Sequence, residues 1–515
     1  MSMKKKRYNE LNTKILNRRE AISKLAAVSA GLGVAVVAAG VAEYLAGTQM
    51  APTKPVERTV TIERTIEHTV TKTETLATTV ATPPATRTLS TADIIALGYK
   101  NYEPATKPLA EPKDWTSPPP EYKNKKEIVI GTSMPLTGIF SWAATWRKLR
   151  EAWVEKVNSE GGLLGLPVRM ICYDDGSDAS RAIANFTKLI TIDKVDLLLS
   201  GCPTATMVPV MNAMDKYRYK PVILSGSSDY ESFLTANMGK GWETAFEIQI
   251  PAEFFNYSTW VWIDAIPADI KPKKVGIIYG TYSPFTIHGS AGAKYFAEER
   301  GMEIAYFQGY PEGTTDFTPM VSAARSAGVE VLLSVDTDLA PTKLILEACR
   351  AMDWQPKIFW SIEVLYPGFE DPTRPGRLQP LVYYTTTAAM HWPTWPDPPY
   401  KDAAFWVEQY KKIFNIAYPN FDAGWAPLEC QILEQAVQSS GSLEFDVLSK
   451  YLMTHSFNTL MGRIEFTDEK IIRGFTMGTT IIDEEGREQV IVPENLATAD
   501  WRKYYPRPPW KEYYP

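Results

Sequence analysis

The chain has 515 residues, 45% of them hydrophobic and 22% charged, and its net charge at pH 7 is −6. That length is enough for about three domains, or for two domains with additional non-globular segments. The hydrophobic fraction and the acidic balance exclude a wholly disordered chain and a chain that coats nucleic acid. The four cysteines and four histidines are widely separated and form no CxxC or similar ligand pattern, so the sequence predicts no metal site and no cofactor.

The N-terminal region has the pattern of an export signal or a membrane anchor. Residues 1–24 contain eight Lys or Arg and two Glu, and residues 25–42 carry no charge. Eighteen such residues are close to the minimum for a membrane-spanning helix, and the basic flank should stay in the cytoplasm. Arg18 and Arg19 resemble a twin-arginine signal, and small residues at the end of the apolar run offer a cleavage site. We therefore predict a signal or an anchor at 25–47, and an extracytoplasmic location for the rest of the chain.

A segment that cannot bury a core follows at 48–124. Residues 52–90 are rich in Thr, with Pro and Val, which is typical of an extracellular stalk. Residues 91–122 add a short amphipathic piece and a Pro-rich stretch, and Pro-rich linkers are semi-rigid. We predict a spacer here, with an exposed linker that has no spacing role as the alternative.

From residue 125 the chain alternates strands and helices. Short apolar runs that end in small or polar residues predict the strands, and apolar positions at helical spacing predict the helices. Repeated βα units imply a parallel sheet with helices on both faces. The first series has strands at 127–133, 168–175, 195–202 and 221–228, and helices at 146–158, 179–192 and 207–217.

A second series of similar length begins at residue 274. Because an open α/β sheet binds its ligand beyond the carboxyl ends of its strands, two such sheets facing each other form a cleft. The strands are predicted at 274–280, 303–310, 329–335 and 357–363, and the helices at 289–300, 318–327 and 341–352. The remaining segments are a strand at 381–388, helices at 402–414, 427–438 and 446–453, strands at 462–466 and 475–482, and an aromatic, Pro-rich tail that should pack on the surface.

Five stretches in these two series carry a family resemblance through their order and spacing: GTSMPLTG, VNSEGGLLGLPV, YDDGSDASRA, GTTDFTPMVSAARSAGVEVLL and LMGRIEFTDEK. Together they resemble the extracellular solute-binding proteins of ABC uptake systems, in the branched-chain amino acid and amide (Leu/Ile/Val-binding) family. The resemblance implies the type I periplasmic-binding-protein fold. This is an α/β fold of two Rossmann-like lobes with parallel sheets, joined by three hinge crossings and closing on a solute.

The resemblance also implies how the chain is divided. The crossings should lie near 247–251, 384–390 and 461–466. The expected parts are a basic segment at 1–24, a signal or anchor at 25–47, a stalk and linker at 48–124, lobe one at 125–248 and 390–460, lobe two at 249–389 and 461–488, and a tail at 489–515.

The same resemblance assigns the solute to loops at the strand ends of both lobes. In lobe one, hydroxyl and backbone NH groups should hold a solute carboxylate, and in lobe two Glu363 takes the position of the acid that meets an ammonium group. The expected solute-binding residues are Trp142, Thr204, Ser227, Ser228, Asp229, Tyr282, Asp336 and Glu363. Each has an ordinary alternative as a turn residue, an exposed acid or a packed aromatic ring.

Some residues of this chain depart from the family pattern. Pro203 lacks a backbone donor, and an ionised Asp229 would repel a carboxylate. The acids together favour a cationic, amide-bearing or polyhydroxylated solute. A disulfide sometimes occurs near Cys202 in the family, but its usual partner position holds no cysteine here and Cys172 lies on the preceding predicted strand. We therefore expect free, buried thiols.

These observations predict a tethered solute receptor outside the cell that hands a small molecule to ABC permease subunits in the membrane. The Walker motif GxxxxGK[ST] is absent from the sequence, as expected for a subunit that does not hydrolyse ATP. One alternative is a ligand-sensing ectodomain of the same fold. A less favoured one is an exported enzyme, for which the sequence has no GxSxG, HExxH or CxxCH motif.

Overall fold

The computed structural model of the chain describes most residues between 89 and 507. The described residues are 89–215, 217, 222–223, 227–236, 242–362, 383–387, 403–414, 422–474, 477–486, 488–494 and 497–507. The predicted signal or anchor at 25–47 lies outside them, as does the predicted stalk as far as residue 88. In the ranges just given, no helix is both long enough and apolar enough to cross a membrane.

The first lobe contains a parallel sheet whose strands are ordered β2-β1-β3-β4-β5. The strands are β1 (Ile128–Met134), β2 (Val168–Asp174), β3 (Leu197–Leu199), β4 (Val222–Ile223) and β5 (Ala245–Phe246). The helices are α4 (Ala144–Ser159), α5 (Ala179–Thr191), α6 (Thr204–Met214), α7 (Tyr230–Thr235), α13 (Ala403–Phe414), α14 (Asp422–Ser440) and α15 (Phe445–Thr454).

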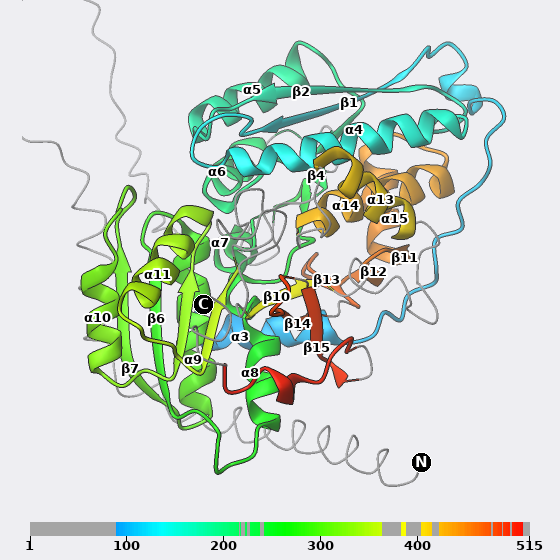
Figure 1. Cartoon of the computed structure of the whole chain (residues 1–515). Helices are drawn as coiled ribbons and strands as arrows, with labels where there is room; N and C mark the ends of the chain where they lie inside the picture. The colour runs from blue at the N-terminus through cyan, green and yellow to red at the C-terminus, as the bar shows by residue number, and fades with distance from the viewer. Residues whose placement is uncertain are drawn as a thin grey trace, which may run out of the picture. The chain divides into compact units, whose positions relative to one another are not determined.

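Both faces of this sheet are buried by helices, which explains why its strands are apolar runs without alternation. Ile128 and Ile130 of β1 belong to the core formed with α4 and α14, whereas Val129 packs against the core of α5 and α6. Leu198 in β3 likewise belongs to the second core, and its neighbours on either side belong to the first. Figure 1 shows β1 and β2 between α4 and α5.

The second lobe contains a sheet in the order β15-β14-β10-β9-β8-β6-β7, parallel from β7 to β10 and antiparallel at β14 and β15. The strands are β6 (Lys274–Gly280), β7 (Glu303–Tyr310), β8 (Val331–Val335), β9 (Ile358–Ser361), β10 (Tyr383–Thr387), β14 (Met477–Ile482) and β15 (Glu488–Val492). The helices are α8 (Tyr257–Ala265), α9 (Pro284–Glu299), α10 (Thr318–Ser326) and α11 (Leu339–Ala351). The α/β fold class predicted from the sequence is confirmed.

The helix α9 begins before its predicted start at residue 289. Pro284 occupies the first turn, where its missing NH group costs nothing and its fixed φ angle suits the helix. The additional turn brings His288 into α9, close to the first lobe, which matters for the candidate site.

In the part of the chain that the structure describes, three connections between the two lobes can be followed to or from their flanking elements. The segment 247–251 joins β5 to η6 (Ala252–Phe254) and α8, β10 leads to α13, and a small antiparallel sheet precedes β14. That sheet consists of β11 (Ser456–Thr459), β12 (Gly462–Phe466) and β13 (Ile472–Arg473). Glu247 of the first crossing forms a parallel bridge with Ile471, so the first and third crossings are hydrogen-bonded to each other. The predicted boundaries of the lobes stay predictions.

Residues 89–124, named the strap here, pack on both lobes, which corrects the expectation of a spacer at 91–122. The strap begins with α3 (Thr91–Gly98) and η2 (Tyr99–Tyr102) and ends with η3 (Pro120–Tyr122). In the second lobe, the ring centroid of Tyr99 lies 5.2 Å from that of Phe254, and the centroid of Tyr102 lies 5.5 Å from that of Tyr257.

The later part of the strap contacts the hinge and the first lobe. The backbone NH groups of Thr106 and Lys107 each donate to Oε2 of Glu465 in β12 at 2.6 Å. Trp115 Nε1 donates to the carbonyl oxygen of Gln438 in α14 at 2.9 Å, which brings the strap onto the first lobe. Backbone hydrogen bonds to a distant strand leave no trace in sequence periodicity, and this is why the strap was predicted as a linker.

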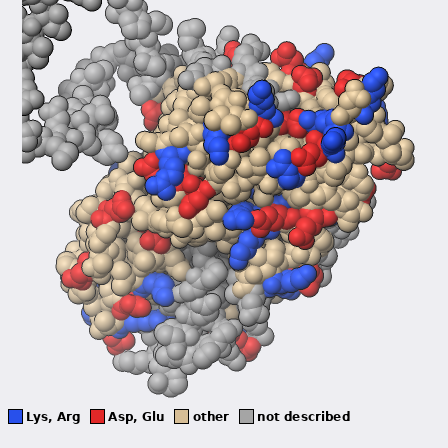
Figure 2. Space-filling view, turned by 90° about the horizontal axis from the view of Figure 1, so that it is seen from above, with Lys and Arg blue, Asp and Glu red and all other residues tan. Residues whose placement is uncertain are grey.

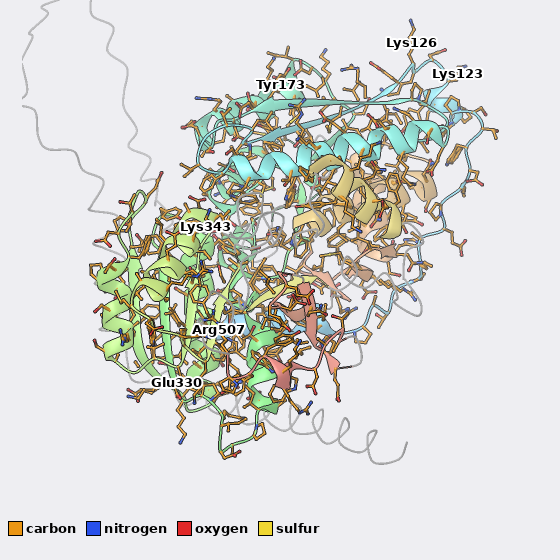
Figure 3. All side chains as sticks on the ribbon, in the orientation of Figure 1. Lys123, Lys126, Tyr173, Glu330, Lys343 and Arg507 are labelled. Atoms are coloured by element: carbon orange, nitrogen blue, oxygen red, sulfur yellow. The ribbon has the colours of Figure 1, made fainter. Side chains whose placement is uncertain are left out.

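The C-terminal segment returns to the second lobe. The segment predicted as a tail from 489 begins instead within β15, an edge strand of the second sheet. Tyr505 packs with its centroid 5.8 Å from that of Trp262 in α8, and the backbone NH of Arg507 donates to the carbonyl oxygen of Lys357 at 3.2 Å. Lys357 also pairs with Glu330 at 2.6 Å (Glu330 and Arg507 are labelled in Figure 3). Lys357 and Glu330 directly precede β9 and β8. The described end of the chain therefore packs at the amino ends of these strands, opposite the candidate site.

Candidate functional site

The predicted site residues that the structure describes all lie in the segments that follow strands. In chain order they are Trp142 after β1 in η4 (Ser141–Ala143), Thr204 after β3, Ser227, Ser228 and Asp229 after β4, Tyr282 after β6, and Asp336 after β8. Glu363, two residues after β9, lies outside the described residues. The carboxyl ends of parallel strands are where open α/β sheets bind ligands, so the placement suits a ligand site.

Thr204 joins the two loops of the first lobe. It is the first residue of α6, directly after the N-cap residue Pro203, and its side chain is buried. Its Oγ1 donates a hydrogen bond to the carbonyl oxygen of Ser227, so the loop after β3 and the loop after β4 are held together. Because this hydroxyl proton is used within the protein, the turn would offer a solute mainly its backbone groups.

The two serines after β4 are bound to the first crossing. Ser227 Oγ donates to Oε2 of Glu247, and Ser228 Oγ donates to Oε1 of Gln249. Ser228 has a φ of 45°, which is uncommon for a residue other than glycine. The backbone NH of Ala252 donates to the carbonyl oxygen of Ser228 at 2.9 Å. The loop that the sequence assigns to the solute is therefore fastened to the hinge.

Glu247 and Gln249 were not predicted as part of the site, although the sequence carries a signal for them. They alternate with Phe246, Ile248 and Ile250, and all five side chains are buried. In a strand-like segment, polar and apolar residues that alternate point to opposite sides. Buried polar side chains in such a pattern require polar partners, which here are the two serines.

Asp229 caps a helix. Its Oδ1 accepts a hydrogen bond from the backbone NH of Ser232 at 3.0 Å, and its Oδ2 accepts one from the Ser232 hydroxyl at 2.8 Å. Asp is a preferred N-cap residue because its carboxylate satisfies the unpaired NH groups of the first turn. The carboxylate thus has a structural function at the start of α7, and its contact with a solute remains a prediction.

His288 of α9 links the two lobes at this point, and it is not among the predicted site residues. Its Nε2 lies 3.8 Å from Oδ1 of Asp229 in the first lobe, and its Nδ1 lies 3.3 Å from Oε1 of the fully buried Glu253 in η6. Burial lowers the pKa of His288, but the bond to Glu253 and the charges of Asp229 and Glu231 raise it more, to about 9. The imidazole is therefore a cation at neutral pH. No spacing in the sequence connects these residues.

Tyr282 and Asp336 meet at the strand ends of the second lobe. The Tyr282 hydroxyl donates to Oδ1 of Asp336, which also accepts the backbone NH groups of Thr337 at 2.8 Å and Asp338 at 3.2 Å. Their strands β6 and β8 are neighbours in the sheet, which brings the two side chains together. The other oxygen, Oδ2, is buried and has no hydrogen-bond partner among the residues that the structure describes. Burial raises the pKa of Asp336 to about 7, although the bond from Tyr282 opposes this.

The described residues do not form a metal centre. No group of three or more His, Cys, Asp or Glu side chains with metal-ligand geometry occurs among them. The four cysteines are free thiols, and Cys172 in β2 is separated from Cys202 by the intervening strand β1.

On the face drawn in Figure 2, basic and acidic side chains are interspersed, as is typical of solvated surfaces.

Comparisons with known proteins agree with this architecture. The family model described as periplasmic binding protein matches residues 127–480. Among solved structures, the branched-chain amino acid transporter substrate-binding protein LivJ from Streptococcus pneumoniae, in complex with isoleucine, has a TM-score of 0.58 and 17% identity, covering 71% of this chain and 99% of that chain. The leucine-binding protein LivK from Thermotoga maritima has a TM-score of 0.58 and 15% identity, covering 72% of this chain and all of that one.

The sequence relatives align with a smaller part of this chain than the solved structures do. The Leu/Ile/Val-binding protein homolog 3 of Brucella melitensis is 25% identical over 210 residues, covering 40% of this chain and 53% of the relative. The leucine-, isoleucine-, valine-, threonine- and alanine-binding protein of Pseudomonas aeruginosa is 22% identical over 212 residues, with 39% and 52% covered. The chain spans about half the length of the curated relatives it matches. Because the family model matches more than half of the chain, the chain belongs to the periplasmic binding protein family and has its type I fold.

Proposed function

We propose that the chain is an extracytoplasmic solute-binding protein that captures an amino acid or a related amine-bearing molecule between its lobes and delivers it to an ABC permease. The observation that carries this proposal is the carboxyl group of Asp336, which is fully buried after β8 and has one oxygen that finds no hydrogen-bond partner within the described part of the chain. Leaving a buried acceptor unpaired costs about 1–3 kcal/mol. A solute that brings an ammonium group to Oδ2 would remove this cost.

The surroundings of Asp336 support an amine-bearing solute. Three donors hold Oδ1 in place, so the carboxyl group is already oriented before a solute arrives. A preorganised group loses little conformational entropy on binding. The ring of Tyr282 adds apolar surface beside the carboxyl group, which suits the apolar body of an amino acid side chain.

The first lobe suits the carboxylate of the same solute. The loops at Thr204 and Ser227 are joined to each other, and α6 begins at Thr204. A helix N-terminus favours negative charge, and backbone NH groups of such a turn can donate to a carboxylate. The names of the relatives, which refer to Leu, Ile, Val, Thr and Ala, favour an α-amino acid with an uncharged side chain.

Membership of the family and the predicted N-terminal segment support delivery to a permease and a location outside the cell. The basic residues 1–24 and the apolar run that follows them support export, with tethering at 25–47. The chain then acts as a receptor without chemistry of its own, and the solute leaves unchanged.

Calorimetric titration of the full-length chain in a mild detergent tests the proposal. The probes are L-leucine, L-isoleucine, L-valine, L-threonine and L-alanine, together with 4-methylpentanoate, which lacks the amino group of leucine. At least one amino acid should bind, and 4-methylpentanoate should not. At 100 times the dissociation constant, the bound amino acid should stabilise the chain by about 2.7 kcal/mol.

Two variants make the test specific. Asp336→Asn should abolish or strongly weaken binding, whereas Asp316→Asn, which changes an exposed aspartate in the loop before α10, should bind as the unaltered chain does. Binding of 4-methylpentanoate as tight as that of L-leucine would contradict the role of Asp336. Absence of binding by every amino acid tested would contradict the proposed solute class.

A further inference from the structure

The strap lies before the part of the chain that matches the family, which begins at residue 127, yet it contacts the elements that hold the predicted solute residues. Its centre is Asn101, which is fully buried. Asn101 Nδ2 donates to the hydroxyl oxygen of Tyr230 at 2.8 Å and to the carbonyl oxygen of Ile472 at 2.6 Å. The carbonyl oxygen of Asn101 accepts the backbone NH of Gly474 at 3.0 Å. One strap residue therefore joins α7 to the third crossing.

Tyr230 continues this connection to the first crossing. Its ring is buried, and its hydroxyl donates to the carbonyl oxygen of Gln249 at 3.0 Å. The side chain of Gln249 accepts the hydroxyl of Ser228, and its backbone NH donates to Oε1 of Glu247 at 3.0 Å. Glu247 in turn accepts the hydroxyl of Ser227. A continuous series of buried hydrogen bonds thus runs from Asn101 to both serines of the predicted solute loop.

Such a network is sensitive to the loss of one member. If the amide of Asn101 is removed, the carbonyl oxygen of Ile472 and the hydroxyl of Tyr230 lose a donor in a region without solvent. Groups of this kind then rearrange to find new partners, because an unpaired polar group in a medium of low dielectric is unfavourable. The rearrangement would reach Gln249, since the Tyr230 hydroxyl is its neighbour in the network.

We propose that Asn101 is a positioning residue for solute binding: through Tyr230 and Gln249 it holds the loop 227–229 against the first crossing. The strap is then a working part of the binding protein, and its detachment loosens the solute loop. This inference rests on the proposed function only for its effect on affinity, because the positioning of the loop can be measured without a solute.

Hydrogen–deuterium exchange of the full-length chain, followed by mass spectrometry, measures the positioning directly. In Asn101→Ala, peptides that cover 227–236 and 245–251 should exchange about tenfold faster, while peptides from β6 and β8 should be unchanged. Tyr230→Phe keeps the ring and removes the hydroxyl, so it should give the same local effect even if Asn101→Ala fails to fold. The control is Lys100→Ala, which breaks a more exposed ion pair with Glu469 at 2.5 Å and should leave the loop unchanged.

The double variant separates positioning from general destabilisation. If Asn101 acts through Tyr230, combining both changes should accelerate exchange no more than either change alone, because coupled residues are not additive. Additive acceleration, or an equal acceleration throughout the chain, would overturn the proposal. With L-leucine as the probe, both single variants should weaken binding about tenfold. If the unaltered chain does not bind any amino acid tested, the proposed function fails while the exchange result still decides this inference.

Discussion

His288 of α9 and Glu253 of η6 form a buried contact beside the hinge, with Nδ1 of the imidazole 3.3 Å from Oε1 of the carboxylate. Glu253 is almost fully inaccessible to solvent, whereas His288 keeps 22% of its side chain exposed. The same imidazole faces Asp229 at the start of α7. A single titratable ring therefore connects a helix of the second lobe with the solute loop of the first.

This contact predicts a stability that depends on pH. The pKa of His288 is raised from 6.5 to about 9, so the folded state holds its proton more tightly than the unfolded state does. The contribution should be fully present below pH 6.5 and lost as the pH rises through about 9. His288→Gln should lower the free energy of unfolding at pH 6 by about 3 kcal/mol and change it little at pH 10. Urea unfolding at both pH values measures the difference.

A second histidine serves as the control for this experiment. His455 stacks on the ring of Tyr451, with a centroid distance of 3.8 Å. Replacing His455 removes an imidazole that does not contact Glu253. If His288→Gln destabilised the chain equally at pH 6 and pH 10, the contact with Glu253 would not be an ionic one.

The attachment of the strap to β12 should depend on Glu465. Its carboxylate accepts the NH groups of Thr106 and Lys107 and pairs with Arg473, and these bonds lower its pKa although burial opposes them. Glu465→Gln removes the charge from this buried group, which should cost about 1–3 kcal/mol of stability and release the strap. Limited proteolysis should then cut within 103–124 in the variant before it cuts elsewhere in the lobes.

Glu469→Gln is the matched control for this change, because Glu469 binds Lys100 of the same strap through a more exposed ion pair. Such pairs contribute little to stability. Equal protease resistance of the Glu465→Gln chain and the unaltered chain would show that the strap is held by other contacts.

The lobes could be predicted from the sequence because their strands are continuous apolar runs and their helices have apolar positions at helical spacing. Leu197, Leu198 and Leu199 are buried on both faces of a sheet, and a pattern of this kind has few alternatives. The strap could not be predicted in the same way. The strap is held through the backbone NH groups of Thr106 and Lys107. Because nearly every residue has a backbone NH group, these contacts leave no signal in the sequence.

The candidate site was predictable in position but not in contacts. Ser228 and Asp336 lie beyond β4 and β8, where the predicted strands end, and their contact with a solute stays a prediction. Which partner each side chain chooses depends on residues that are close only in the fold. Gln249 beside Ser228 and His288 beside Asp229 are examples of this.

A buried ion pair in the first lobe gives a prediction about stability alone. Arg150 of α4 and Glu429 of α14 are both fully buried, with Nη2 of the guanidinium 2.6 Å from Oε1 of the carboxylate. The guanidinium also donates to the carbonyl oxygen of Ser200 at 2.9 Å. Arg150→Met leaves a buried acid without its cation and should cost about 3–5 kcal/mol.

The double variant Arg150→Met/Glu429→Met should regain most of that loss, because an apolar pair of similar volume needs no counter-charge. Unfolding of the two single variants and the double variant in guanidinium chloride measures the coupling free energy between Arg150 and Glu429. If the double variant were as unstable as the sum of the single ones, the two side chains would contribute independently.

Asp336 gives the sharpest prediction, because stability and binding should change in opposite directions. The folded-state pKa of this acid is about 7, above the unfolded value of 3.8, and burial is the main cause. Its contribution to stability is therefore lost as the pH rises from 3.8 to about 7, since the buried carboxyl group must ionise. Asp336→Asn should stabilise the solute-free chain at pH 8 by on the order of 4 kcal/mol.

Binding of an amine-bearing solute requires the ionised form and should follow the opposite trend. For L-leucine the affinity of the unaltered chain should rise on the order of 100-fold between pH 5 and pH 8, because only a small fraction of the carboxyl group is ionised at pH 5. Asp336→Asn should bind more weakly at pH 8 and lose this pH dependence. A stabilised variant with unchanged affinity and unchanged pH dependence would assign the ammonium group to another acid. A variant that loses both stability and affinity would show that Asp336 stabilises the fold after β8, because removal of a group that serves binding alone should increase stability.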